Sequence, residues 1–150
     1  MASTYELLEK AERIELTAEQ LYQALAGRFA GEARALFQRL AIEEAQHAAR
    51  IRLLAVRYRH DKRLVASALG DLALLERLHG EAQQVLGEVL EGRWDGDPAA
   101  ALRGAVALER RFCVVHAQVL AQDGHPELKG FFEQLSAQDE AHRALLEGAG

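Results

Sequence analysis

The sequence has little cysteine, little proline and no long hydrophobic run. Cys113 is the only cysteine in 150 residues, which excludes an internal disulfide and any zinc or iron site built from several cysteines of one chain. No apolar run approaches the about 20 residues that a helix needs to cross a bilayer, so we expect no membrane partner. Hydrophobic residues make up 49% of the chain and charged residues 27%, which favours a folded globular protein over a disordered one.

Positive charge is also in short supply. Lys and Arg number 18 against 23 Asp and Glu, which gives a net charge of −5. Proteins that follow the phosphates of nucleic acids normally carry a basic balance or stripe, so we expect no nucleic-acid partner. The first residues are polar and acidic and lack the apolar core of a signal peptide, which predicts a cytoplasmic location.

Residues that favour helices dominate the composition. Ala, Leu, Glu, Gln and Arg are frequent, β-branched residues are sparse, and there are only two prolines, which predicts an all-α protein. Ser3 with Glu6 has the pattern of a capping box, and Asp97 before Pro98 marks another helix start. Apolar spacing and end signals predict five helical segments, the third interrupted by three glycines. They cover about residues 4–28, 31–58, 62–91, 97–122 and 126–146.

Two parts of the sequence repeat each other. Residues 40–47 (LAIEEAQH) align with residues 135–142 (LSAQDEAH). In each half a glutamate lies in the preceding helical segment and a ring side chain follows it by seven residues: Glu15 and Tyr22, then Glu109 and His116. We therefore expect one domain over residues 1–150. Its parts would be a helix pair at 4–58, a crossover segment at 59–96 and a second helix pair at 97–148.

Six acidic and histidine side chains interrupt the apolar stripes of the predicted helices. A carboxylate and an imidazole three residues apart point the same way on a helix, and buried carboxylates are costly unless they are paired. No stripe supplies a Lys or Arg at the same level, whereas two divalent cations would neutralise four carboxylates. The pattern therefore predicts a carboxylate-bridged dimetal site. Its ligands would be Glu15, Glu44, His47, Glu109, Asp139 and His142.

The sequence resembles the ferritin-like diiron-carboxylate proteins, most closely the rubrerythrin branch, over about residues 5–58 and 98–146. The resemblance is carried by Glu15 with Tyr22, Glu44-Ala-Gln-His47, Glu109 and Asp139-Glu-Ala-His142. It implies a ferritin-like four-helix bundle of two helix pairs, with an additional helical crossover. It also implies two iron ions, with manganese or zinc chemically possible. Glu15, Glu44 and His47 would hold one metal, and Glu109, Asp139 and His142 the other, with Glu44 bridging.

Three features depart from the family pattern. Asp139 replaces the usual glutamate and is shorter by a methylene group, which leaves open whether it bridges the metals. Phe112 lies three residues after Glu109, where relatives often carry another carboxylate. The rubredoxin domain is missing, so the resemblance implies a separate electron donor protein; by the same analogy we expect a homodimer.

The resemblance implies an oxidoreductase that reacts with hydrogen peroxide or dioxygen. An iron-binding protein of the ferroxidase type, without peroxidase turnover, is the alternative. A plain helical interaction domain with vestigial ligands is a third reading. Metal content distinguishes the third from the other two, and turnover with peroxide distinguishes the first from the second.

Other residues near the motifs receive weaker expectations. The resemblance implies that Tyr22 hydrogen-bonds a ligand carboxylate, whereas His116 is open between such a donor, an additional ligand and a core histidine. The remaining residues have ordinary structural readings. Glu76 and His79 are expected to face solvent, Cys113 to lie in the core, and Glu12, Glu43 and Glu140 to lie on the surface.

Overall fold

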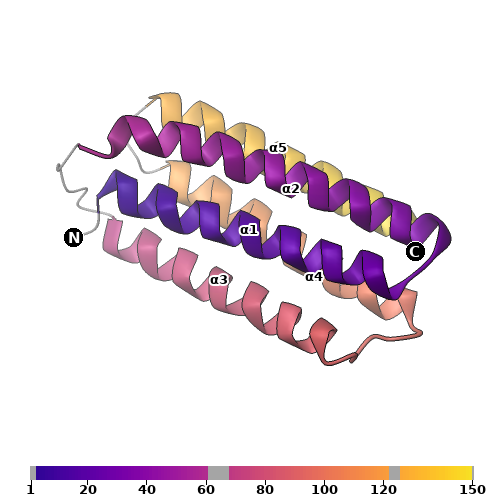
Figure 1. The fold of residues 1–150 in the computed structure, drawn as a ribbon. Helices are drawn as coiled ribbons and strands as arrows, with labels where there is room; N and C mark the ends of the chain where they lie inside the picture. The colour runs from indigo at the N-terminus through magenta and orange to yellow at the C-terminus, as the bar shows by residue number, and fades with distance from the viewer. Residues whose placement is uncertain (1–2, 61–67, 122–125, 150) are drawn as a thin grey trace.

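The computed structural model describes residues 3–60, 68–121 and 126–149. Within these ranges the chain forms five α-helices and no strands, so the predicted all-α class is confirmed (Figure 1). The helices are α1 (Thr4–Arg28), α2 (Gly31–Tyr58), α3 (Ala68–Leu90), α4 (Pro98–Ala121) and α5 (Pro126–Ala149).

The helix starts follow the capping signals of the sequence. The Ser3 hydroxyl accepts a hydrogen bond from the backbone N–H of Glu6 at 3.2 Å, and the Glu6 carboxylate accepts one from the backbone of Ser3 at 3.1 Å. At the start of α4, the Asp97 carboxylate accepts from the backbone N–H of Ala100 at 3.0 Å. These bonds satisfy N–H groups that have no partner within the helix. The last helix continues three residues beyond its predicted end.

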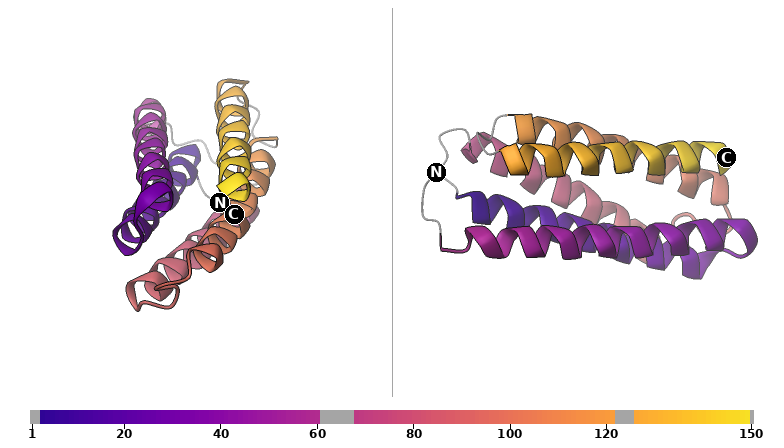
Figure 2. Two further views of the ribbon diagram at one scale, coloured as in Figure 1. Left: turned by 90° about the vertical axis from the view of Figure 1, so that its right-hand side faces the viewer. Right: turned by 90° about the horizontal axis from the view of Figure 1, so that it is seen from above.

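Two antiparallel helix pairs, α1 with α2 and α4 with α5, form the body of the bundle (Figures 1 and 2). Helix α3 lies along α1, on the side away from α2, and also touches α4. Its 23 residues span roughly 35 Å at a rise of 1.5 Å per residue. The chain therefore returns along the bundle before α4 begins, and α2 and α4 run in the same direction. The helix is continuous through Gly80 and Gly87, whereas residues 62–67 of the predicted segment lie outside the described ranges.

Among the described residues, the buried apolar side chains form two clusters at different levels of the bundle. The larger cluster includes Leu21, Leu25 and Phe37, and the smaller one includes Leu8 and Ile51. Along α1, α2 and α5 the acidic and histidine positions fall between these levels. Because apolar packing closes the bundle on both sides of that layer, polar groups within it are shielded from water.

The connection between α3 and α4 is fixed by an aromatic side chain. Trp94 packs on Gly104 of α4 so closely that a Cβ at Gly104 would lie 2.5 Å from the ring. Arg28 at the end of α1 donates to Asp95 of this connection at 2.8 Å. The turn at Gly92 has φ +85°, a conformation that glycine adopts without strain. These contacts tie α3 and its connection to α1 and α4.

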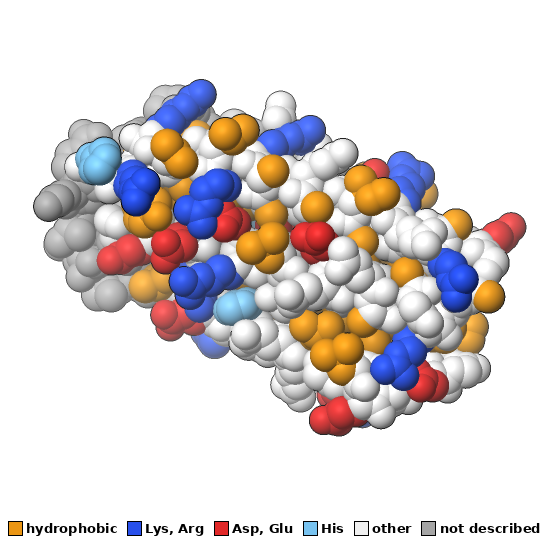
Figure 3. All heavy atoms as spheres, viewed as in Figure 1, with side chains coloured by type: hydrophobic (Ala, Val, Ile, Leu, Met, Phe, Trp, Pro, Cys, Tyr) orange, Lys and Arg blue, Asp and Glu red, His pale blue; other side chains and the backbone are white. Residues whose placement is uncertain are grey.

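The surface shows no segregation of charge on the face drawn in Figure 3, where acidic and basic side chains are interspersed over the helices. None of the helices in the described part of the chain combines the length and the apolar character that a bilayer crossing would need.

Candidate metal centre

The six side chains that interrupt the apolar stripes all point into the bundle and lie close together. Glu15 comes from α1, Glu44 and His47 from α2, and Glu109 from α4; the fifth helix contributes the other two. The four carboxylates are 0% exposed and the two histidines 3%. The structure therefore brings together, from four helices, the full set that the sequence singled out: Glu15, Glu44, His47, Glu109, Asp139 and His142.

Glu44 occupies the middle of the group. Its Oε2 atom lies 3.5 Å from Nδ1 of His47, and its Oε1 atom lies 3.1 Å from Nδ1 of His142. His47 Nδ1 is also 3.7 Å from Glu15, and His142 Nδ1 is 3.6 Å from Glu109. The two imidazole rings stack with their centroids 5.5 Å apart. Each oxygen of Glu44 thus faces a different histidine and a different helix pair.

Within these six residues, two sets of donor atoms have the spacing of metal ligands. Glu15, Glu44 and His47 form one set, and within it the donor atoms lie within 4.8 Å of one another. The second set obeys the same limit and consists of Glu44, Glu109, Asp139 and His142. Because Glu44 belongs to both sets, the arrangement has the form of two adjoining cation sites that share a carboxylate.

Many of these donor atoms have no hydrogen-bond partner although they are buried. They are both oxygens of Glu15 and of Glu44, one oxygen each of Glu109 and Asp139, and Nδ1 of His47 and of His142. Within the described ranges, the ion pairs of these carboxylates are all with histidines and none is with Lys or Arg. Buried acceptors without donors are costly, and divalent cations with mixed oxygen and nitrogen ligands would satisfy them. The residues present fit a dimetal centre.

Burial and mutual repulsion shift the protonation of the carboxylates. Desolvation, with the neighbouring charge of Glu44, raises the pKa of Glu15 to about 8. Desolvation and the charge of Glu109 raise the pKa of Asp139 well above its usual range. Burial favours the neutral form of Glu44 too, but its close polar contacts with Glu15 and both histidines outweigh burial and lower its pKa. Without metal, protons therefore reduce the charge repulsion between these carboxylates.

Burial alone would lower the pKa values of the two histidines, but their carboxylate neighbours raise them. Desolvation lowers the pKa of His47, but its close contacts and charge interactions with Glu15 and Glu44 outweigh desolvation and raise the pKa to about 10. For His142, contacts with Glu109 and Glu44 overcome the same desolvation and raise the pKa to about 11. In the absence of metal these imidazolium ions carry the positive charge that balances the carboxylates.

Two further rings contact the group across the helix pairs. The Tyr22 hydroxyl on α1 donates to Glu109 on α4 at 2.5 Å. Burial, together with the charge of Glu109, raises the pKa of Tyr22 well above its usual value. His116 on α4 faces Glu15 on α1, with its Nε2 atom 3.3 Å from Oε1. Each ring thus reaches the carboxylate at the start of the opposite half of the sequence repeat.

Glu43 also contacts the group, and the sequence reasoning missed it. Its carboxylate is half-buried and lies 2.5 Å from Nε2 of His142. The expectation that it lies simply on the surface is wrong, because α5 packs over this edge of α2. The same expectation is wrong for Glu12, which is buried with 8% of its surface exposed and pairs with Arg52 at 2.5 Å. The signal that could have found Glu43 is its position beside Glu44, on the side of the helix that faces α5.

The other expectations about neighbouring residues have mixed outcomes. Glu140 is exposed and pairs with Arg143, as predicted for a surface residue. Glu76 is exposed, whereas His79 is partly buried and lies 3.2 Å from the Thr17 hydroxyl. Cys113 is half-buried, not enclosed in the core, and its sulfur lies 3.3 Å from the Ser136 hydroxyl.

A small polar pocket leads from the surface to the two histidines. It has a volume of about 170 Å³ and lies between α2 and α5. Arg39, Arg50 and Gln138 line it together with His47 and His142. The gap between these helices therefore gives small molecules a route to the edge of the carboxylate group.

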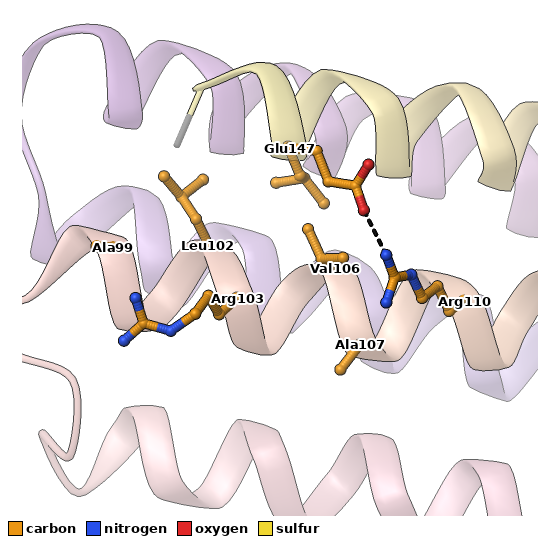
Figure 4. A pocket seen from close by; sticks show the side chains of 8 residues that line it. Ala99, Leu102, Arg103, Val106, Ala107, Arg110 and Glu147 are labelled. Carbon is orange, nitrogen blue, oxygen red and sulfur yellow. Dashed lines mark hydrogen bonds and ion pairs between the residues drawn. The ribbon is translucent and has the colours of Figure 1, made fainter.

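A larger pocket of about 510 Å³ lies elsewhere, between α4 and the end of α5 (Figure 4). Arg103, Val106 and Arg110 line it, and Arg110 donates to Glu147 across it at 2.6 Å. None of the six clustered side chains lines this pocket. Of these two pockets, only the smaller one is lined by side chains of the clustered group.

Comparison with known proteins agrees with this geometry. The family model described as Rubrerythrin matches residues 6–149. No curated protein and no solved structure gives a significant match. The family is a ferritin-like one whose members bind a dimetal centre. With almost the whole length matched, and with a helical bundle around buried carboxylates and histidines, the chain belongs to the rubrerythrin family.

Proposed function

We propose that this protein is a diiron oxidoreductase that reduces hydrogen peroxide or dioxygen with electrons from a separate donor protein. The observation that carries the proposal is the position of Glu44, which belongs to both sets of candidate ligands. Glu15, Glu44 and His47 would hold one iron, and Glu109, Asp139 and His142 the other. Four carboxylates balance the charge of two divalent ions, and neutral imidazoles complete the ligands.

When bound, the two iron ions supply two electrons for reduction of the oxidant. The protein's own side chains would hold these ions and shield them from water. Tyr22 fixes one oxygen of Glu109, and Glu43 fixes the outer nitrogen of His142. Such contacts to ligand residues set the orientation and basicity of the ligands. The apolar clusters on either side keep water out of the layer.

The pocket at the two histidines is better suited to a small neutral oxidant than to the passage of iron ions. Its volume of about 170 Å³ admits peroxide or dioxygen. Glu43 pairs with Arg39 in its lining, but Arg50 leaves the charged lining with a net positive charge, and positive charge at an entrance opposes the passage of cations. The alternative function, iron uptake of the ferroxidase type, is favoured by the half-exposed carboxylate of Glu43 in the same pocket.

Metal content and turnover test the proposal together. Metal-free protein is loaded anaerobically with ferrous iron, and peroxide is added with an artificial electron donor. We expect two irons per chain and repeated peroxide consumption well above that of free iron. A single round of iron oxidation without further peroxide consumption would support the ferroxidase alternative. A chain that retains almost no metal would leave only a helical interaction domain.

Glu44→Ala tests the ligand set directly. We expect the variant to lose both metals and, with them, the rise in melting temperature that metal gives the unaltered protein, because metal binding contributes to folding stability. Thermal unfolding with and without a chelator measures this. Glu76→Ala is the matched control, since Glu76 also precedes a histidine by three residues but is exposed on α3. An unchanged metal-dependent shift in Glu44→Ala would contradict the assignment.

A further inference from the structure

His116 is a fully buried histidine whose two ring nitrogens both face carboxylates of the centre. Its side chain is 0% exposed. Nδ1 lies 2.5 Å from Oδ2 of Asp139, and Nε2 lies 3.3 Å from Oε1 of Glu15. Tyr22 has the corresponding place in the other half of the repeat, but its hydroxyl reaches one carboxylate only. His116 thus contacts two carboxylates of the centre, one with each ring nitrogen.

The contact with Asp139 occupies one oxygen of a short carboxylate. Oδ2 is held by His116, whereas Oδ1 is buried without a hydrogen-bond partner. A glutamate at this position would be longer by one methylene group, so its oxygens would not keep this place. The short side chain of Asp139 therefore suits the position of the His116 ring, which contacts its Oδ2 atom.

Among the residues that the structure describes, none is a hydrogen-bond partner for the second nitrogen of His116. Nε2 is buried and unsatisfied although it points toward Glu15. A neutral imidazole that donates from Nδ1 to a carboxylate presents a lone pair at Nε2. Metal-bound histidines commonly have this arrangement, with the outer nitrogen held by a carboxylate. Glu15, His116 and Asp139 also place their donor atoms within 4.8 Å of one another.

We infer that His116 is a seventh metal ligand, which binds through Nε2 on the Glu15 side of the centre while Asp139 orients its ring. The inference rests on the proposed dimetal centre and makes that centre unequal. His47 and His116 would give two nitrogen ligands to the metal held by Glu15, and His142 would give one to the other. Because Glu44 is shared, each metal would then have four ligand residues, and the two metals would differ only in how many of these are nitrogen ligands.

Zinc-loaded protein with nitrogen-15-labelled histidine tests the inference without any turnover. Two-bond proton–nitrogen correlations distinguish a protonated ring nitrogen from a metal-bound one in each imidazole. We expect three rings to change on zinc loading, two of them bound through Nδ1 and the ring of His116 bound through Nε2. If only two rings change and His116 keeps a proton on Nε2, it is a hydrogen-bond donor to Glu15 and the inference is overturned.

His116→Phe assigns the signal and measures its consequence. We expect the third signal to vanish and one of two zinc ions to bind about tenfold or more weakly. His79→Phe is the control, because His79 is only partly buried and contacts Thr17 away from the carboxylates. Unchanged affinity for both ions in His116→Phe would count against the inference. If zinc fails to bind the unaltered protein, or changes neither His47 nor His142, the proposed dimetal centre fails instead.

Discussion

The environment of each carboxylate decides its part in this centre, and two adjacent glutamates on α2 show the difference. Glu44 is fully buried and shares its oxygens between two histidines. Glu43 lies at the edge of the pocket and holds the outer nitrogen of His142. The turn between successive residues of a helix points one side chain inward and the other along the surface of the next helix.

Glu43→Gln should weaken metal binding without unfolding the protein. The amide is as large as the carboxylate but is a poorer acceptor for the N–H of His142, and such changes next to ligand histidines typically cost about 10–100-fold in metal affinity. Zinc competition with a chromophoric chelator measures the affinity. Glu140→Gln is the matched control, because Glu140 also adjoins a candidate ligand but pairs with Arg143 at the surface. Equal affinities in the two variants would refute a role for Glu43.

Tyr22→Phe should destabilise the metal-free protein by about 1–3 kcal/mol, since Glu109 loses the donor to a buried oxygen. The rest of the ring stays in place against Phe37, to which it stacks at 6.2 Å. Urea unfolding of Tyr22→Phe, Glu109→Gln and the double variant forms a cycle that isolates the pair. A coupling free energy near zero would mean that the hydrogen bond contributes nothing to stability.

Among the helices, α3 shows most clearly that packing against neighbouring helices can outweigh a weak helical propensity. Its glycines weaken the helical signal, yet the helix is continuous because its apolar side packs on α1. Leu75 and Leu78 are buried there. The connection that follows depends on a close contact in which the ring of Trp94 lies directly on Gly104.

Gly104→Ala should destabilise the protein by about 1–3 kcal/mol, because the new methyl group would overlap the Trp94 ring and force it to move. Gly80→Ala is the matched control, since it also lies within a helix but its added methyl group meets nothing within 4 Å. That control should be neutral or stabilising by about 0.5–1 kcal/mol. Thermal and urea unfolding of both variants make the comparison. Destabilisation of both by the same amount would show that the Trp94 contact is not the cause.

For the molecule as a whole, the buried ionisable groups make stability depend on pH. Glu15 has a folded-state pKa of about 8, above its ordinary 4.5, so the stability it contributes is present below pH 4.5 and is lost as the pH rises to 8. The pKa of His47 is raised from 6.5 to about 10, so the stability that His47 contributes is lost as the pH rises from 6.5 to 10. His142 acts in the same direction. All three make the metal-free protein less stable as the pH rises.

We therefore expect the free energy of unfolding of the metal-free protein to fall between pH 5 and pH 8, with Glu15 alone contributing roughly 3 kcal/mol of the fall. Urea unfolding in the presence of a chelator measures it. Glu15→Gln should flatten the slope, because its amide does not titrate. The metal-loaded protein should show the opposite trend, since metals displace these protons and bind more tightly as the pH rises. Stability that rises with pH in the metal-free protein would contradict the prediction.

The local pattern of the sequence determined the helices, their starts and the six inward polar positions. Ser3, Glu6 and Asp97 cap their helices through contacts within one turn, and Glu15 interrupts an apolar stripe that must face inward. Such features depend on neighbours a few residues away, so they can be read without the fold.

Only the tertiary structure decided which groups meet across helices. Glu43 contacts His142 and His116 contacts Glu15 because separate helices pack at one rotation and one height, and no local spacing encodes these two quantities. The same packing gives Glu44 its central position, and it left Cys113 half-buried. The sequence thus determined the polar groups that must be buried, whereas the packing of the helix pairs decided the partner of each.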